Sequence, residues 1–316
     1  MPLNLTAGAD DSGRRLDRVL RKALRQTPLS AIHRMLRQGQ VLVNGRKAGA
    51  DRRVLAGETI TVSTTECEGV EVKNREKNAL DMPEILFEGS GLLILNKPAG
   101  LSVHGKDSVD NLVQSYLAPK LRPSLSFKPG PLHRLDRPSS GVLVFSSSLE
   151  GAQRFSEMMR EGKIKKQYLA VVEGQIENKE VWNDELFRDT KIKKTFTGNS
   201  GENNTNHLKG KPALTRVRNL IGNKDYSLVL LEIETGRTHQ IRAQAASRRH
   251  PLLGDKKYGG GPLSGGFLLH AWRLYLPPPF PPMIEAPLPE NFNNKINKLF
   301  GLSGHGNQFY KHLFDG

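Results

Sequence analysis

The segment His133–Phe145, HRLDRPSSGVLVF, places a single carboxylate among several cations directly before an apolar run. Such a run is typical of a buried strand, so the polar residues before it are expected to form the loop that enters the strand. Pro138 restricts the backbone of this loop, and Gly141 permits a close approach by another part of the chain. The segment therefore predicts that Asp136 is held on a stiff loop at the mouth of a strand.

The whole chain of 316 residues carries 47 Lys and Arg against 32 Asp and Glu, a net charge of +15. An excess of this size favours a polyanionic partner, either nucleic acid or an acidic membrane surface. No apolar run is long enough to span a bilayer, and the first residues do not look like a secretion signal, so we expect a cytoplasmic protein. The single Cys67 excludes an internal disulfide and a cysteine-rich zinc site.

Basic residues are concentrated near the N-terminus, where residues 12–63 contain ten Arg and two Lys against three acidic residues. Apolar residues recur at helical spacing from Leu16 to Leu24 with cations on the other faces, which predicts a basic amphipathic helix. A second helix, a strand and the hairpin dipeptide Asn44-Gly45 follow, and together they predict a compact α/β module. The candidate RNA-binding residues on its two helices are Arg15, Arg18, Arg34 and Arg37.

This basic module has two other interpretations. A solvated helix face is the usual fate of a charge run, but here the cations lie on two consecutive helices, which favours binding. A membrane-surface helix would show bulky apolar side chains opposite the basic face, or a lipidation site, and the sequence shows neither. RNA is therefore the expected partner, with no membrane association.

Capping residues predict where three helices begin. Ser30 is the expected N-cap of the second basic helix, and Thr238 that of a later helix that carries Arg242. Ser147 and Glu150 have the spacing of a capping box.

The rest of the chain divides by composition. Residues 64–82 are polar and lack periodicity, so they are interpreted as a linker. Residues 83–300 combine short strands and helices in one larger domain, and 301–316 are assigned to a C-terminal tail. Within the larger domain, the insertion 195–211 is predicted to be a flexible loop close to RNA.

Three polar residues of the larger domain stand out by their positions. Lys97 ends a strand that runs into a Pro-Ala-Gly turn, Tyr168 lies within a strand, and Arg242 follows a strand on the helix that starts near Thr238. Five segments that include them are LNKPAGLSVHG, HRLDRPSSGVLVF, KKQYLAVVEG, TGRTHQIRAQ and FLLHAWRLYLP. In this order they resemble the RluA-type family of pseudouridine synthases over residues 85–277, most closely its members that modify large-subunit ribosomal RNA. The N-terminal module resembles the S-four type of RNA-binding domain.

The resemblance implies an α+β fold, with a mixed, largely antiparallel central sheet, flanking helices and a small N-terminal α/β RNA-binding domain. It implies that Asp136 is the catalytic residue, which Arg242 pairs with and keeps ionised. The implied substrate-binding residues are Tyr168 beside the target base, Arg134 in the flipping of the uridine, and Lys97 and Leu268 near the pocket. Pseudouridine formation involves no redox change, so we expect no cofactor and no metal. We also expect a monomer.

Other interpretations remain open at this point. Asp136 could form a plain surface ion pair with Arg134 or Arg137, or half of a metal site with His133. The chain could act on transfer RNA, or be a non-catalytic RNA-binding assembly factor. A glycoside hydrolase would need a second acid in these segments, and none accompanies Asp136. Pro138-Ser139 and Ala243-Gln244 depart from the family pattern, which bears on loop stiffness and substrate detail, and His239 is expected to be a structural hydrogen-bonding group.

Overall fold

The computed structural model describes residues 2–63, 80–177, 179–198 and 209–302. Most of the predicted linker, including Cys67, and most of the predicted tail lie outside these ranges. None of the helices within them is long and apolar enough to cross a membrane.

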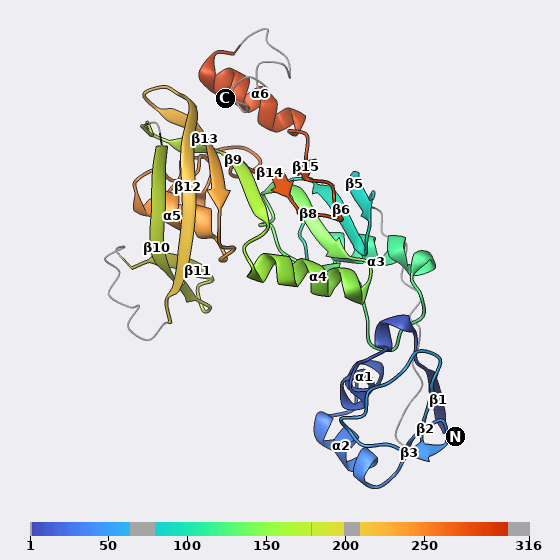
Figure 1. Ribbon diagram of the computed structural model, residues 1–316. Helices are drawn as coiled ribbons and strands as arrows, with labels where there is room; N and C mark the ends of the chain where they lie inside the picture. The colour runs from blue at the N-terminus through green and yellow to red at the C-terminus, as the bar shows by residue number, and fades with distance from the viewer. Residues whose placement is uncertain (1, 64–79, 178, 199–208, 303–316) are drawn as a thin grey trace.

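The N-terminal residues form a small domain with its own sheet and core (Figure 1). Its elements are β1 (Leu3–Thr6), η1 (Ala9–Asp11), α1 (Leu16–Ala23), α2 (Leu29–Arg37), β2 (Val41–Val43), β3 (Arg46–Lys47) and β4 (Thr59–Val62). The sheet has the order β1-β4-β2-β3. Asn44 and Gly45 both have positive φ between β2 and β3, as a tight hairpin requires. Because β1 pairs along β4, this domain extends further toward the N-terminus than residues 12–63.

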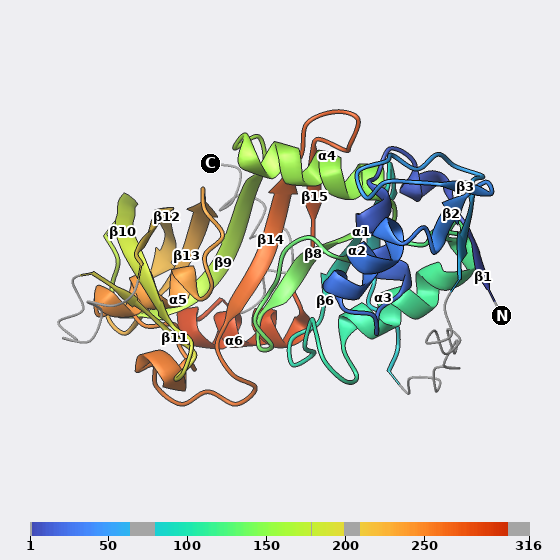
Figure 2. The ribbon, with the colours of Figure 1, turned by 90° about the horizontal axis from the view of Figure 1, so that it is seen from below.

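The remaining chain builds one large sheet with helices packed on it (Figures 1 and 2). Its strands are β5 (Ile85–Gly89), β6 (Leu92–Lys97), β7 (Gly130–Pro131), β8 (Ser140–Ser146), β9 (Lys165–Glu173), β10 (Lys179–Asp189), β11 (Lys194–Thr197), β12 (Lys211–Gly222), β13 (Tyr226–Ile233), β14 (Leu269–Tyr275) and β15 (Met283–Glu285). Its helices are α3 (Val109–Leu117), η2 (Ala118–Lys120), α4 (Leu149–Arg160), α5 (Gln240–Ser247), η3 (Lys256–Tyr258) and α6 (Glu290–Phe300).

The main path of this sheet runs β11-β10-β12-β13-β9-β14-β8-β6-β5. Every pairing is antiparallel except the one between β14 and β8, so the predicted mixed, largely antiparallel sheet is confirmed. At the parallel junction Gly141 has a φ of 106°, and a Cβ there would lie 2.1 Å from the carbonyl oxygen of Ala271. The predicted close approach at Gly141 is therefore confirmed.

Alternation along the central strands sends side chains to opposite faces. Leu93 and Leu95 of β6 join the core cluster that contains the apolar residues of α3 and α5. Leu92 and Ile94 join the cluster that contains those of α4. This period of two is what a sheet covered on both faces requires.

The two domains are joined through a buried carboxylate. Asp11 accepts hydrogen bonds from two backbone N–H groups of residues 124–126, at 2.8 and 2.9 Å, and from two of their hydroxyl groups. Burial alone would raise the pKa of Asp11, but these hydrogen bonds outweigh it and lower the pKa. The neighbouring Asp10 accepts from the N–H of Leu149, the first residue of α4, at 3.0 Å. These contacts fix the small domain against the large one.

Three local predictions were wrong. α2 begins one residue before Ser30, with Pro28 as its N-cap, because the fixed φ of proline suits a helix start. α4 is capped by Ser148 instead of Ser147, since the Ser148 hydroxyl accepts from the N–H of Gly151 at 3.0 Å. The N-cap of α5 is His239, whose backbone is left-handed, and not Thr238.

The prediction that residues 195–211 form a flexible loop was also partly wrong, because Lys194–Thr197 forms strand β11, which pairs with β10. Residues 199–208 of this insertion lie outside the described residues.

Candidate active site

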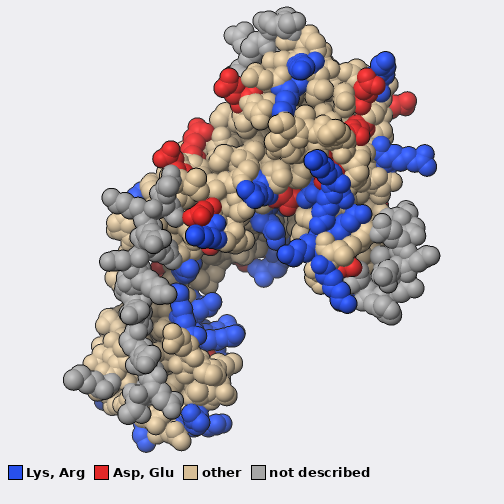
Figure 3. Space-filling model, turned by 180° about the vertical axis from the view of Figure 1, so that it is seen from behind, with Lys and Arg blue, Asp and Glu red and all other residues tan. Residues whose placement is uncertain are grey.

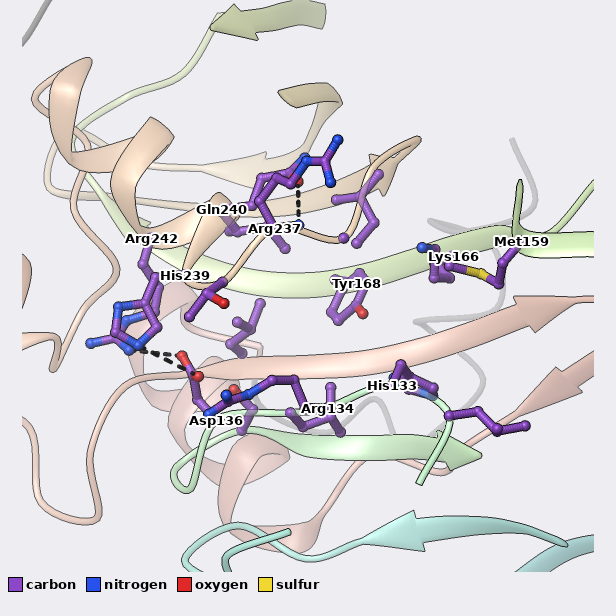
Figure 4. A pocket seen from close by; sticks show the side chains of 18 residues that line it. His133, Arg134, Asp136, Met159, Lys166, Tyr168, Arg237, His239, Gln240 and Arg242 are labelled. Carbon is purple, nitrogen blue, oxygen red and sulfur yellow. Dashed lines mark hydrogen bonds and ion pairs between the residues drawn. The ribbon is translucent and has the colours of Figure 1, made fainter. Parts of the chain in front are cut away.

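A cavity of about 250 Å³ opens between the loop before β8 and the turn that leads into α5 (Figure 4). Strand β9 forms its floor, and its wall is completed by the end of α4 and the start of β14. The lining residues include Leu132, His133, Arg134, Asp136, Ser139, Met159, Lys166, Tyr168, Ile233, Gly236, Arg237, His239, Arg242 and Leu269. Several sequence-predicted site residues, from segments far apart in the chain, therefore meet in one cavity.

Asp136 and Arg242 form the central contact of this cavity. Nη1 of Arg242 donates to Oδ2 of Asp136 at 2.7 Å, across 106 residues of sequence. The other edge of the guanidinium forks onto Asp255, with Nε donating at 2.6 Å and Nη2 at 2.8 Å. Asp255 is 1% exposed. This buried carboxylate holds Nε and Nη2 of Arg242, and the remaining nitrogen, Nη1, is directed to Asp136.

Two aromatic rings complete the surroundings of Arg242. Its guanidinium carbon lies 4.9 Å from the ring centre of Tyr258 and 4.5 Å from that of Phe267. Burial would lower the pKa of Arg242, but the hydrogen bonds and charges of Asp255 and Asp136 outweigh it and raise the pKa. The guanidinium therefore stays charged and fixed, and Asp136 is held in one orientation.

His239 lies on the other side of Asp136. Its Nε2 is 3.8 Å from Oδ1 of Asp136, and its Nδ1 lies 2.9 Å from the hydroxyl of Tyr258. Burial lowers the pKa of His239 to about 4, against the opposing attraction of Asp136. The imidazole is therefore neutral near pH 7, and it contacts Tyr258 as a hydrogen-bonding group.

Tyr168 and Arg134 lie between Asp136 and the far end of the cavity (Figure 4). Tyr168 is buried, and its pKa is raised by burial and by the charge of Asp136, so the phenol stays protonated. Arg134 is exposed at the rim. The two side chains thus offer an aromatic ring inside the cavity and an exposed cation at its opening.

The structure corrects the assignment of Lys97 to substrate contacts. Lys97 is fully buried and does not line the cavity. Its Nζ donates to the carbonyls of Pro98, Arg137 and Ser139 at 2.8, 3.3 and 2.7 Å. Burial lowers its pKa to about 8, partly opposed by Asp136. Lys97 therefore supports the loop that carries Asp136 from behind.

Leu268 is misassigned by one residue. It packs in the core cluster of Leu169 and Trp272, whereas its neighbour Leu269 lines the cavity. Successive residues of an extended chain face opposite sides, so a shift of one position exchanges the two faces.

One ring nitrogen of His133 is engaged within the fold and not by Asp136. Its Nε2 accepts the backbone N–H of Val144 at 3.1 Å, and burial lowers its pKa to about 3. Within the described ranges, no group of three His, Cys, Asp or Glu side chains is placed to hold a metal ion.

Sequence reasoning missed three residues of the site, namely Asp255, Tyr258 and Lys166. Asp255 is the N-cap of η3 and Tyr258 is its last residue, in the segment GDKKYGG, whose glycines and paired polar residues were the one available signal. Lys166 stands two residues before Tyr168 and therefore shares its face of β9.

Basic side chains surround the hollow between the two domains (Figure 3). They gather on the side of the small domain that faces the large one, and on the large domain across from it. Arg18, Arg34 and Arg37 of the small domain are exposed. Arg15 instead forks onto Asp17 at 3.1 and 2.9 Å, so part of its hydrogen-bonding capacity is used within the domain.

The structure combines a carboxylate that is held by an arginine in a cavity with a separate basic domain. Two human proteins of known structure share the fold. RNA pseudouridylate synthase domain containing 4 has a TM-score of 0.55 and 23% identity, covering 68% of this chain and 92% of its own. RNA pseudouridylate synthase domain containing 1 has a TM-score of 0.54 and 22% identity, covering 72% of this chain and 93% of its own.

Sequence comparison identifies the family. A family model described as RNA pseudouridylate synthase matches residues 91–247, and the S4 domain model matches residues 14–60. Ribosomal large subunit pseudouridine synthase C of Buchnera aphidicola (subsp. Schizaphis graminum) is 32% identical over 311 residues, 92% of this chain and 95% of the relative. The Escherichia coli K12 protein of the same name is 31% identical over 318 residues, which cover 92% of this chain and 94% of the relative. The chain belongs to the RNA pseudouridylate synthase family.

Proposed function

We propose that this enzyme isomerises specific uridines of large-subunit ribosomal RNA to pseudouridine, with Asp136 as the catalytic carboxylate. The relatives that span nearly the whole chain carry large-subunit ribosomal names. The observation that carries the proposal is the 2.7 Å contact of Arg242 with Asp136 in a cavity that also holds Tyr168. We further propose that the protein acts as a monomer in the cytoplasm, without cofactor or metal.

The reaction breaks the bond between uracil N1 and ribose C1′, turns the base and forms a bond between C5 and C1′. The proton on C5 is lost and N1 gains one, so no electrons are exchanged with another molecule. An ionised carboxylate can start this sequence by adding to the base, by adding to the sugar, or by taking a proton from the sugar. All three routes need a carboxylate that is fixed in direction, and the 2.7 Å hydrogen bond from Arg242 fixes Asp136.

The target base must first leave the RNA stack, at a cost of a few kcal/mol. In the proposed complex Tyr168 packs against the extruded base, and Arg134 at the rim fills the space that the base leaves. The exposed arginines of α1 and α2 bind RNA phosphates, which predicts affinity that falls steeply with salt.

The proposal is tested by mapping pseudouridine in isolated large-subunit ribosomal RNA treated with the wild type and with Asp136→Asn. Carbodiimide adducts that stop reverse transcriptase report the product. We expect product with the wild type, and retained RNA binding without product for Asp136→Asn. Glu234→Gln is the matched control, because Glu234 also pairs with an arginine, at 2.7 Å, but lies outside the cavity.

Two outcomes would favour the alternatives. A wild type that modifies transfer RNA and leaves ribosomal RNA unchanged would overturn the substrate. An Asp136→Asn variant that fully replaces the wild type in a deletion strain would favour a non-catalytic assembly factor.

A further inference from the structure

Lys166 is a buried cation without a counter-charge. It lies on β9 two residues before Tyr168, is 6% exposed and lines the cavity. Across the described part of the chain, its ammonium has no hydrogen-bond or ion-pair partner. The turn before α5 passes close by, because a Cβ added to Gly236 would lie 3.6 Å from Nζ. Burial lowers the pKa of Lys166 to about 8.

The other cations of this region are accounted for. Arg242 is neutralised by two carboxylates, and Lys97 is held by three carbonyls behind the loop. Arg134 and Arg237 are exposed at the rim. Lys166 is mostly enclosed by protein and lines the cavity, and a cavity wall that retains an unpaired ammonium suits a ligand that supplies negative charge.

The reaction itself creates that charge on the base. Cleavage of the bond between N1 and C1′ leaves its electron pair on the uracil, where it spreads to O2 and O4. Addition of a carboxylate to C6 of the uracil also pushes electrons onto O4. Negative charge therefore develops on the uracil oxygens whichever atom Asp136 attacks.

We propose that Lys166 is a second catalytic residue, whose ammonium stabilises the negative charge that develops on the uracil oxygens; this inference rests on the proposed function. Tyr168 lies between Asp136 and Lys166 (Figure 4). A base that packs on Tyr168 with its ribose toward Asp136 directs its opposite edge, which carries O4, toward Lys166. Lys166 donates hydrogen bonds there and neither gains nor loses a proton.

The position of Lys166 favours the base over an RNA phosphate. Its side chain lies inside the cavity beside the apolar Met159, Leu132 and Ile233. A base seated in the cavity displaces water from this place, so a charge interaction there becomes stronger than at the surface. In the proposed complex the phosphates of the RNA strand lie outside the cavity, where the exposed Arg237 can reach them.

The test is the single-turnover rate of Lys166→Met at saturating ribosomal RNA, with the dissociation constant measured separately. Loss of one preorganised group that stabilises developing charge lowers rates about 100-fold to 1,000-fold. We expect a loss of about 100-fold in rate, with little change in affinity. Lys165→Met is the matched control, because Lys165 is the exposed neighbour on β9 and does not line the cavity.

Folding and rescue supply independent readouts. Lys166→Met removes an unpaired buried charge, so its unfolding midpoint is expected to equal or exceed that of the wild type. In Lys166→Ala, added methylammonium is expected to restore part of the rate, whereas methanol is not. Lys166→Arg retains the charge and is expected to be faster than Lys166→Met.

The possible outcomes separate the two proposals. If the wild type makes no pseudouridine in ribosomal RNA, the proposed function fails first. If the wild type is active and Lys166→Met keeps its saturating rate, the role of Lys166 is refuted while the function stands. A variant with weaker binding but a normal saturating rate, or one that methylammonium does not rescue, would also refute the role.

Discussion

Asp255→Asn tests whether the carboxylate behind Arg242 holds the site together. The substitution keeps the shape of the side chain but removes its charge and replaces one acceptor by a donor. Wild-type Asp255 accepts two hydrogen bonds from the guanidinium of Arg242, at 2.6 and 2.8 Å. Both side chains are buried: that of Asp255 is 1% exposed and that of Arg242 is 8% exposed. One of these bonds survives in the variant, and the other becomes a contact between two donors.

The expected cost follows from these contacts. Breaking a buried ion pair costs about 3 to 5 kcal/mol, and a hydrogen bond to a charged group contributes about 1.5 to 3 kcal/mol. Since one bond survives, we expect Asp255→Asn to lower the free energy of unfolding by about 3 kcal/mol. Asp136→Asn should cost less, about 1 kcal/mol, because Arg242 keeps its fork to Asp255. The stabilising acid and the catalytic acid are thus predicted to be different residues.

Urea unfolding at pH 7 measures these costs, and single-turnover assays measure activity. We expect Asp255→Asn to reduce the rate at saturating RNA with little effect on binding, because a loosened Arg242 no longer fixes Asp136. The control is Glu234→Gln, whose partner Arg216 and own side chain are 55% and 46% exposed, so its cost should stay below about 1 kcal/mol. An Asp255→Asn protein that unfolds no earlier than this control would refute the reasoning.

Three further predictions concern the junction, the strand contact and the pH dependence. Asp11→Ala removes the acceptor of four hydrogen bonds between the domains, so the radius of gyration in X-ray scattering and the KM for RNA should rise while the saturating rate holds. Gly141→Ala should cost at least about 3 kcal/mol in urea unfolding, since its Cβ would meet a backbone carbonyl of β14 and its φ is positive. Burial lowers the pKa of His270 to about 4 in the folded protein. As pH falls, His270 therefore becomes protonated near pH 6.5 in the unfolded chain but only near pH 4 in the folded protein. Stability should therefore fall as pH drops below 6.5, by about 2 kcal/mol at pH 5, and His270→Gln should remove this part of the slope.

Each of these predictions has a control. Asp51→Ala changes an exposed acid of the small domain and should leave the radius of gyration unchanged. Gly100→Ala meets no atom within 4 Å and carries only the strain of its φ of 89°, so it should cost clearly less than Gly141→Ala. His104 is 58% exposed, and His104→Gln should keep the full pH slope. Equal effects in a variant and its control would contradict the corresponding explanation.

Local patterns predicted much of the fold because they depend on neighbours in sequence. The apolar run that ends at Phe145 lies in β8, and Gly141 before this run proved necessary because a Cβ there would collide with the backbone of β14. The predicted helix starts were wrong by one residue for α4 and α5 and by two for α2, because several adjacent residues could act as caps and tertiary contacts decided among them. The consecutive leucines 268 and 269 show no alternation, so the sequence alone could not tell which of them faces the cavity.

Long-range partners of the site could not be predicted in the same way. The pairing of Asp136 with Arg242 was expected only through the family resemblance, because 106 residues separate them. Asp255 lies in a turn with no periodic pattern, and its role depends on where α5 places Arg242. Lys165 and Lys166 are adjacent, so they lie on opposite faces of β9, and only the structure shows that the face of Lys166 is the buried one.

The charges of the cavity are arranged along the axis on which the proposed reaction moves electrons. At the ribose end, two carboxylates surround the single charge of Arg242, so that end is negative overall. At the far end, Lys166 supplies one positive charge, and Tyr168 lies between the two ends. A base bound along this axis experiences a field that draws electrons from the sugar toward its carbonyl oxygens, which is the direction of the bond cleavage. Exchanging the charge at either end would oppose that movement, so Lys166→Glu should slow the reaction more than the neutral Lys166→Met does.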